Sequence, residues 1–251
     1  MLDKVSVIMQ NLFMKMCLID CRADIKILNK IETLGFEICL MPLNKNASFL
    51  CESHPDISLC RISNNELIYS KDCDEKLLST LHSKGLILIE GNSSIGSKYP
   101  SEIKYNAARI GKYLIHKLNS TDSKILEECE KRNIELLNVK QGYTQCSLAV
   151  VKQDLAITSD LGIYNTLKNT EEISLLLIPP QESIRLYDGK TGFIGGASGR
   201  IDDQHFSIAG NASLLNNYKE INKFLENNEV KLISLSDEMP FDLGTLMFFT
   251  L

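Results

Sequence analysis

The stretch QGYTQCSLAVVKQDLAITSD, residues 141–160, has a cysteine at the start of one apolar strand and an aspartate at the end of the next. A thiolate in such a place is a nucleophile that attacks electron-poor carbon, which makes Cys146 a candidate catalytic residue. Cys146 could also be a small apolar side chain that fills a corner of the core. Asp160 could be a catalytic carboxylate or the N-cap of the helix predicted after it.

His54 and Asp56 form a second candidate pair in the sequence HPD. Their i, i+2 spacing at the start of a strand points both side chains the same way, as a proton shuttle beside a cation anchor requires. The alternative is a simple turn in which Asp56 binds its own backbone.

The stretch GFIGGASG, residues 192–199, has four glycines in eight residues. It is either a tight start to a strand or a loop where a ligand approaches the backbone, and we predict Gly195, Gly196 and Ser198 as substrate-binding residues. No helix with G-x-G-x-x-G spacing follows, so it is not a nucleotide fingerprint. Asp242, just before Leu-Gly-Thr, is in register with these turns and is predicted to face the same site.

Composition excludes several classes of function. The 251 residues are 44% hydrophobic and carry a net charge of -5, with no Lys/Arg run longer than two, which argues against nucleic-acid binding. The eight cysteines are irregularly spaced and the four histidines lie far apart, so we expect no zinc cluster. No apolar run approaches the roughly 18 residues of a membrane span. The first 20 residues lack the pattern of a secretory signal, so we expect a cytoplasmic protein with reduced thiols.

Internal repetition predicts the fold. Five segments share the order strand, anchor residue, helix, strand, and they cover residues 16–42, 67–90, 117–139, 155–180 and 206–236. The anchors are Asp20, Asp72, Asp122, Asp160 and Asn211, and each is a good N-cap residue. Most units have a further strand before the first, and the apolar C-terminal stretch LGTLMFFTL is predicted to supply that strand for the first unit. Such pairing closes the units into a ring without exposed sheet edges.

Five strand-strand-helix-strand units in a ring resemble the pentein fold, the α/β-propeller of the guanidino-group-modifying enzymes. The motifs HPDI, GYTQC and GFIGGASG also resemble those of an uncharacterised clostridial family assigned to this fold. The resemblance implies a single α/β domain over residues 1–251, with pseudo-fivefold symmetry. The catalytic motifs occur in the family's cyclic order but begin two units later, which a closed ring tolerates. Ile57 and Cys146 fall at the same place in their units, so the turns that carry His54, Asp56 and Cys146 should converge on the axis.

The sequence also departs from the family. Ile194 and Ala197 stand where the family usually has Glu and Asp, and Gln145 replaces the histidine before the cysteine. The stretch Thr158-Ser159-Asp160 lacks the family's middle arginine. These differences weaken the case for an arginine-like substrate more than the case for thiol chemistry.

The resemblance implies a cysteine-dependent hydrolase or transferase that acts on a guanidine, an amidine or a related C–N centre of a small cationic molecule. Asp56 and Asp160 would hold the cation, Cys146 would attack its central carbon, and His54 would act as general acid and then base. This mechanism needs no metal and no organic cofactor. One alternative is a non-catalytic binding module like the ribosome anti-association factor of the same fold. Another is an enzyme of the same scaffold that acts on a non-guanidino ligand.

Overall fold

The computed structural model describes residues 14–170 and 172–251, which form five three-stranded sheets with helices between their strands. Residues 1–13, on which the predicted lack of a secretory signal depends, lie outside the described residues. In the described part, no helix is both long and apolar enough to cross a membrane.

Every sheet has the same topology: the middle strand pairs antiparallel with one neighbour and parallel with the other, which follows it in sequence. In strand order, the sheets are β15 (Met247–Thr250), β1 (Lys15–Asp20) and β2 (Glu37–Met41); β3 (Leu59–Arg61), β4 (Glu66–Tyr69) and β5 (Ile87–Glu90); β6 (Ala108–Ile110), β7 (Tyr113–His116) and β8 (Glu135–Asn138); β9 (Leu148–Lys152), β10 (Leu155–Thr158) and β11 (Ser174–Leu177); and β12 (Ser198–Arg200), β13 (His205–Ile208) and β14 (Lys231–Ser234).

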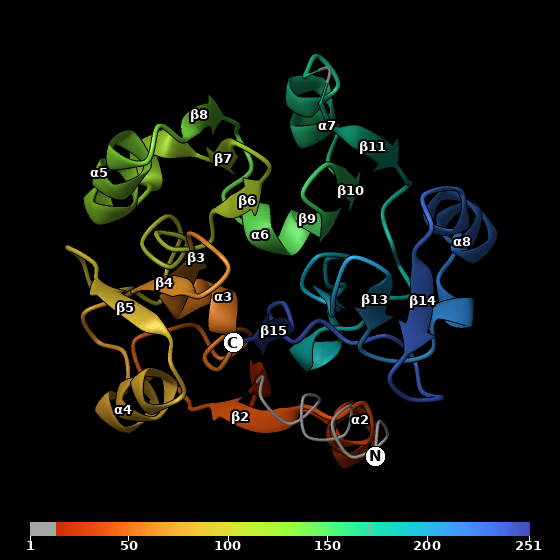
Figure 1. The fold of residues 1–251 in the computed structure, drawn as a ribbon, viewed down its shortest axis with the longest axis horizontal. Coiled ribbons are helices and arrows are strands. Elements are labelled where there is room, and N and C mark those ends of the chain that lie inside the picture. The colour runs from red at the N-terminus through yellow and green to blue at the C-terminus, as the bar shows by residue number, and fades with distance from the viewer. Residues whose placement is uncertain (1–13, 171) are drawn as a thin grey trace, which may run out of the picture.

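A helix links the middle strand of each sheet to the parallel outer strand, because a parallel pair needs a crossover. These helices are α2 (Ile25–Thr33), α4 (Glu75–Ser83), α5 (Ser123–Lys131), α7 (Leu161–Leu167) and α8 (Tyr218–Asn227). The five predicted units are therefore confirmed as units of strand, helix and strand. They lie around a common centre with the helices outside (Figure 1).

The predicted anchors do not all cap helices. Asp122 and Asp160 do cap α5 and α7 through their side chains, and Asn211 caps the 3-10 helix η3 (Ala212–Leu214) that precedes α8. The prediction is wrong for the first two units, where Asp24 and Asp74 are the N-caps of α2 and α4. Asp20 is the last residue of β1, and Asp72 follows β4. Both come before the residue that caps the helix, so their carboxylates can bond elsewhere.

The inner strands β3, β6, β9, β12 and β15 bring the units together. As predicted, the C-terminal strand β15 pairs with β1, antiparallel, from Lys15↔Thr250 to Leu18↔Met247. β9 contacts β6 and β12, β12 contacts β15, and β3 contacts β6. The Arg61 guanidinium in β3 donates to the Phe248 carbonyl in β15, at 2.9 Å. The residues just before the five inner strands bond to one another, so the N-terminal ends of these strands lie on one side of the centre.

The core consists of apolar clusters between neighbouring units rather than within them. One cluster joins Val151 in β9 and Ile157 in β10 to Phe206 in β13 and Leu225 in α8. Another joins Leu18 in β1 to Leu67 in β4 and Leu81 in α4. Each unit thus buries its apolar faces against its neighbours, and this fixes the turns before the inner strands relative to one another.

Candidate active site

Two single-turn helices introduce the site. α3 (Pro55–Ser58) leads into β3, and α6 (Thr144–Ser147) leads into β9. Ile57 and Cys146 are the third residues of these turns, in the equivalent register that the sequence predicted. Pro55 suits the first turn of a helix because it has no N–H to satisfy there.

Cys146 lies in a hydrogen-bond network at the start of β9. It is 3% exposed. Its Sγ donates to Oδ2 of Asp56 at 3.0 Å and accepts from Nδ2 of Asn106 at 3.2 Å. Oδ1 of Asn106 in turn accepts from the backbone N–H groups of Gln145 and Cys146, at 2.9 and 3.3 Å. Asn106 therefore fixes both the backbone and the sulfur of the cysteine.

The surroundings of Cys146 favour the neutral thiol. Burial, and then the charges of Asp56 and Asp242, raise the pKa of Cys146 well above its usual value. Burial also raises the pKa of Asp56 to about 6, although hydrogen bonds from Cys146 and Thr245 partly oppose this shift. A positive charge placed beside these groups would reverse both effects, since it stabilises a thiolate and a carboxylate alike.

His54 lies between two carboxylates. Its Nε2 is 3.7 Å from Oδ2 of Asp20, and its Nδ1 is 3.9 Å from Oδ1 of Asp242. Burial nevertheless lowers the pKa of His54, which favours the neutral ring. Two buried atoms in this region, Nε2 of His54 and Oδ1 of Asp56, have no hydrogen-bond partner among the described residues. Such atoms are costly to bury unless a ligand meets them.

Asp242 lies beside His54, and glycines leave space for its side chain. Its two oxygens accept from the backbone N–H groups of Phe193 and Gly244, at 2.8 and 3.0 Å. A Cβ at Gly196 would lie 2.0 Å from Oδ1 of Asp242, and a Cβ at Gly195 would lie 2.4 Å from the Gln145 carbonyl oxygen. The backbone of this glycine-rich stretch thus approaches protein groups of the site closely.

Three of the predicted substrate-binding residues, Gly195, Gly196 and Ser198, contact protein groups near Cys146. The Gly196 N–H donates to the Cys146 carbonyl at 3.0 Å. Ser198 Oγ donates to the Gly195 carbonyl at 3.3 Å and is buried. Gly195, Gly196 and Ser198 therefore support the turn that carries Cys146.

The structure does not bring Asp160 into the cluster. Its Oδ1 accepts from the N–H of Ile163 at 2.8 Å, as an N-cap, and its Oδ2 accepts from Nε2 of Gln141 at 3.1 Å. Gln141 also accepts from the N–H of Tyr143 at 3.0 Å. Asp160 thus stabilises the turn before α6 through Gln141 and acts on Cys146 only indirectly. Its carboxylate is already engaged in the cap of α7.

Sequence reasoning missed Asp20, Asn106 and Thr245. Asp20, read as a helix cap, instead accepts from Ser53 Oγ at 2.5 Å and from the Arg22 guanidinium at 2.9 and 3.1 Å. Thr245 Oγ1 donates to Oδ2 of Asp56 at 2.9 Å. Asn106 and Thr245 stand two residues before β6 and β15, as Cys146 stands two residues before β9. That shared register was the available signal.

Aromatic side chains cover the Asp20 side of the cluster. The Arg22 guanidinium, whose side chain is 17% exposed, lies 3.8 Å from the centroid of the Tyr187 ring. The same ring lies 6.4 Å from that of His54 and 4.7 Å from that of Phe241. The protein thus holds one of its own guanidinium groups between a carboxylate and an aromatic face, next to His54.

Three solved structures share the fold. SxtG, an amidinotransferase from Microseira wollei in the saxitoxin biosynthetic pathway, is 12% identical, with a TM-score of 0.54 over 84% of this chain and 74% of its own. The inosamine-phosphate amidinotransferase of Streptomyces griseus is 9% identical, with a TM-score of 0.52 over 83% of this chain and 72% of its own. DDAH from Pseudomonas aeruginosa, a cysteine-to-serine mutant complexed with citrulline, is 8% identical, with a TM-score of 0.54 over 95% of this chain and 99% of its own.

These proteins belong to the pentein superfamily, so the predicted resemblance is confirmed at the level of the fold. No protein with curated annotation matches the sequence. A family model described as "Family of unknown function (DUF6873)" matches residues 18–247, and the chain therefore belongs to this family.

Proposed function

We propose that this protein is a cysteine-dependent enzyme that modifies a guanidine or amidine on a closed, five-unit pentein propeller. The observation that carries the proposal is the buried cluster of Cys146, His54, Asp56 and Asp242, in which Nε2 of His54 and Oδ1 of Asp56 have no hydrogen-bond partner in the described part of the chain. A nucleophile, a neutral base and two carboxylates in one buried place are the groups that such chemistry needs. The similarity to amidinotransferases and to DDAH supports the proposal through the fold alone.

A planar cation fits the charge of the cluster. The free Oδ1 of Asp56 can accept one N–H of an amidinium, and Asp242 adds a second negative charge nearby. Asp242 takes the place that the sequence analysis gave to Asp160. The bound cation would lower the pKa of Cys146 and of Asp56, so the substrate itself would activate the thiol. We infer that the partner is a small cationic molecule and that the protein works in the cytoplasm.

The chemistry then follows in balanced steps. Cys146 Sγ forms a bond to the central carbon, and the thiol proton, which is donated to Oδ2 of Asp56 in the free protein, passes to His54, whose imidazolium is stabilised by Asp20 and Asp242. The bond from carbon to the leaving nitrogen breaks as His54 gives its proton to that nitrogen. In a hydrolase, water then adds to the carbon of the thiouronium intermediate and leaves a proton on His54. The C–S bond breaks, and the sulfur recovers that proton. An acceptor amine in place of water gives a transferase.

Selective alkylation tests this proposal. Seven of the eight cysteines are buried and Cys21 is intermediate, so a neutral reagent such as iodoacetamide should label Cys21 first. We expect 2-chloroacetamidine, which carries an amidinium, to label Cys146 in preference and with saturable kinetics. His54→Ala should slow the labelling of Cys146 by about 100-fold, the usual contribution of a general acid or base, and leave Cys21 unaffected. If 2-chloroacetamidine labels Cys21 in preference to Cys146, as iodoacetamide is expected to do, the proposal is contradicted.

A second candidate is a non-catalytic binding module of the same fold. The full burial of Cys146 and its raised pKa favour this candidate, because a resting thiol of this kind is inert. It predicts that 2-chloroacetamidine has no preference for Cys146. An enzyme for a non-guanidino ligand predicts fast labelling of Cys146 by both reagents.

A further inference from the structure

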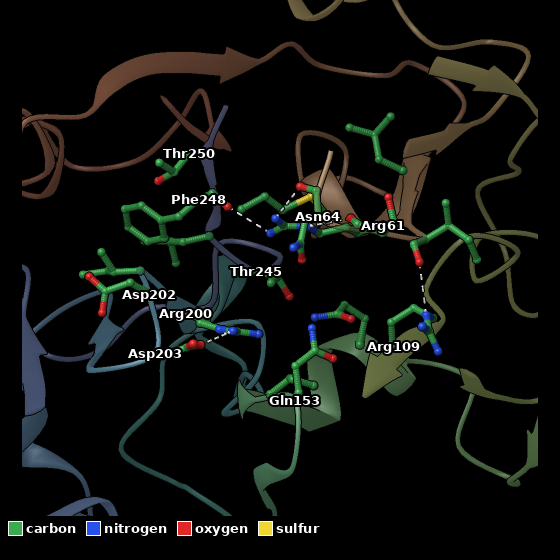
Figure 2. Close-up of a pocket in the computed structure, with 18 of the residues that line it drawn as sticks. Arg61, Asn64, Arg109, Gln153, Arg200, Asp202, Asp203, Thr245, Phe248 and Thr250 are labelled. Atoms are coloured by element: carbon green, nitrogen blue, oxygen red, sulfur yellow. Dashed lines mark hydrogen bonds and ion pairs between the residues drawn. The ribbon is translucent and has the colours of Figure 1, made fainter. Parts of the chain in front are cut away.

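A pocket of about 360 Å³ runs along the inner strands, from Gln145 and Thr245 just before β9 and β15 to residues at and beyond the opposite ends of the strands. Its lining includes Arg61 in β3, Arg109 in β6 and Arg200 in β12, together with Gln153 after β9 and Thr250 in β15. Figure 2 shows these side chains around one open space, with Thr245 between them. All five inner strands thus contribute to the pocket, as they do to the Cys146 cluster at their other ends.

Two of the arginines bond only to carbonyl groups among the described residues. Arg61 donates to the carbonyls of Ser63, Asn64 and Phe248 at 2.7 to 3.2 Å. Arg109 donates to those of Ile62 and Tyr113, at 3.2 and 2.7 Å. These bonds orient the guanidinium groups and leave each with N–H donors to spare, since a guanidinium has five. They do not neutralise the charges.

The carboxylates that line the pocket are already engaged. Asp203 pairs with Arg200, and Asp202 accepts from the His205 ring and from the N–H of Gln204. Arg61 and Arg109 therefore keep their charge without a carboxylate partner in the described part of the chain. Burial, and then the charge of Arg200, lower the pKa of Arg61 to about 10, so Arg61 stays protonated at pH 7. Like charges held together in this way indicate a site for an anion.

We propose that this pocket binds a small molecule that carries a phosphate group. Guanidinium groups match phosphate oxygens in geometry and charge, and three of them from three sheets suit a tetrahedral dianion better than a single planar carboxylate. Gln145, Gln153, Asn64 and Thr250 add neutral polar groups to the lining, for the rest of the molecule. The volume exceeds that of phosphate alone and leaves space for a short carbon skeleton. The pocket adjoins the proposed catalytic cluster at Thr245, which also bonds to Asp56, but the binding of phosphate does not depend on the function of that cluster.

Isothermal titration calorimetry tests the site with three probes: inorganic phosphate, glycerol 3-phosphate and succinate, each at the same ionic strength in chloride. We expect glycerol 3-phosphate and inorganic phosphate to bind, and succinate to bind at least tenfold more weakly. Tighter binding of the ester than of inorganic phosphate would identify an organic phosphate as the ligand. The reverse would identify free phosphate.

Arg200→Gln is the variant to use, because its described side-chain bond goes to Asp203 and not to the backbone. It should weaken the binding of phosphate about tenfold or more. Arg132→Gln makes the same charge change at the end of α5, away from the pocket, and should bind like the wild type. Thermal unfolding of the unliganded variants is the check that both are folded. The proposal is overturned if the wild type binds neither phosphate, if succinate binds as tightly, or if Arg200→Gln binds like Arg132→Gln.

Discussion

The two ends of the inner strands differ in charge and in openness. At the N-terminal ends, Asp56, Asn106, Cys146 and Thr245 form a buried network, with Asp242 beside it. At the other ends, three half-buried arginines line an open pocket. The same five strands thus carry an acidic, closed site and a basic, open one.

This difference shows how the shared polarity of the strands separates two chemistries. Equivalent turns meet before the strands and hold polar side chains in fixed positions. Residues within and after the strands meet on the other side of the centre. Thr245 belongs to both regions, since it lines the pocket and bonds to Asp56. Variants at matched positions on the two ends can therefore test whether the regions differ as described.

Asn106→Ala should produce the largest loss of stability. It removes four hydrogen bonds around Cys146 and Asp56, and we expect the free energy of unfolding to fall by about 4 kcal/mol. Asn64→Ala at the pocket end is the control, because the bond described for Asn64 uses its main-chain carbonyl, which the substitution keeps. Its effect should stay within about 0.5 kcal/mol. Urea unfolding measures the stability of both variants. Equal losses of stability would contradict the difference described between the two ends of the strands.

Asp56→Asn should change how stability depends on pH. The pKa of Asp56 is raised from 3.8 to about 6 in the folded protein, so ionisation of Asp56 destabilises the fold as the pH rises through this window. The amide cannot ionise, and we expect the variant to gain up to about 3 kcal/mol over the wild type between pH 4 and pH 7. Urea unfolding across this range measures the difference. A difference that is independent of pH would show that Asp56 is not buried as a carboxylate.

Gly244→Ala and Gly189→Ala compare two glycines with the same φ of +69°. Both alanines carry the strain of the left-handed region. A Cβ at residue 244 would lie 2.1 Å from Cβ of His54, whereas one at residue 189 would meet no atom of the described residues within 4 Å. We expect Gly244→Ala to be about 2 kcal/mol less stable than Gly189→Ala, as for overpacked cores, and to label more slowly at Cys146. Thermal and urea unfolding give the first result, and equal stabilities would place His54 elsewhere.

Thr245→Val should have the smallest effect. It removes bonds to Oδ2 of Asp56 and to the Gly195 carbonyl, at a cost of about 1 kcal/mol. The Thr245 bond lowers the pKa of Asp56, so its loss should move the acid-dependent step in stability to higher pH. Thr250→Val, on the exposed pocket side, is the matched control. If both variants titrate alike, Thr245 does not connect the two regions.

The sequence predicts the five units because amphipathic periodicity and strand-helix order are local properties. It also brings Cys146, Asp56, His54 and Asp242 together, because equivalent turns in a ring must converge. It cannot separate Asp20 from Asp160, since both follow a strand. Asp24 takes over the helix cap in the first unit, which frees Asp20 to approach His54, while α7 starts directly after Asp160. That choice depends on turn length and on tertiary contacts.

The sequence does not predict the arginine pocket, and the reason is related. Arg61, Arg109 and Arg200 are single residues in three different units, and the chain as a whole is acidic. No local run of charge marks them. Only the register of the inner strands places them around one space, and this register comes from the packing of the sheets.

The pKa of Cys146, with and without a bound cation, tests the central claim most directly. Thiolate absorbance in the ultraviolet, taken as the difference between wild type and Cys146→Ser, can be titrated in the absence and presence of acetamidine. We predict a thiol that resists ionisation in the free protein, because of burial and the nearby carboxylates, and a pKa lowered by at least about one unit when acetamidine binds. The shift should be absent in Asp56→Asn. An unchanged titration at saturating acetamidine would contradict a cation-activated nucleophile at Cys146.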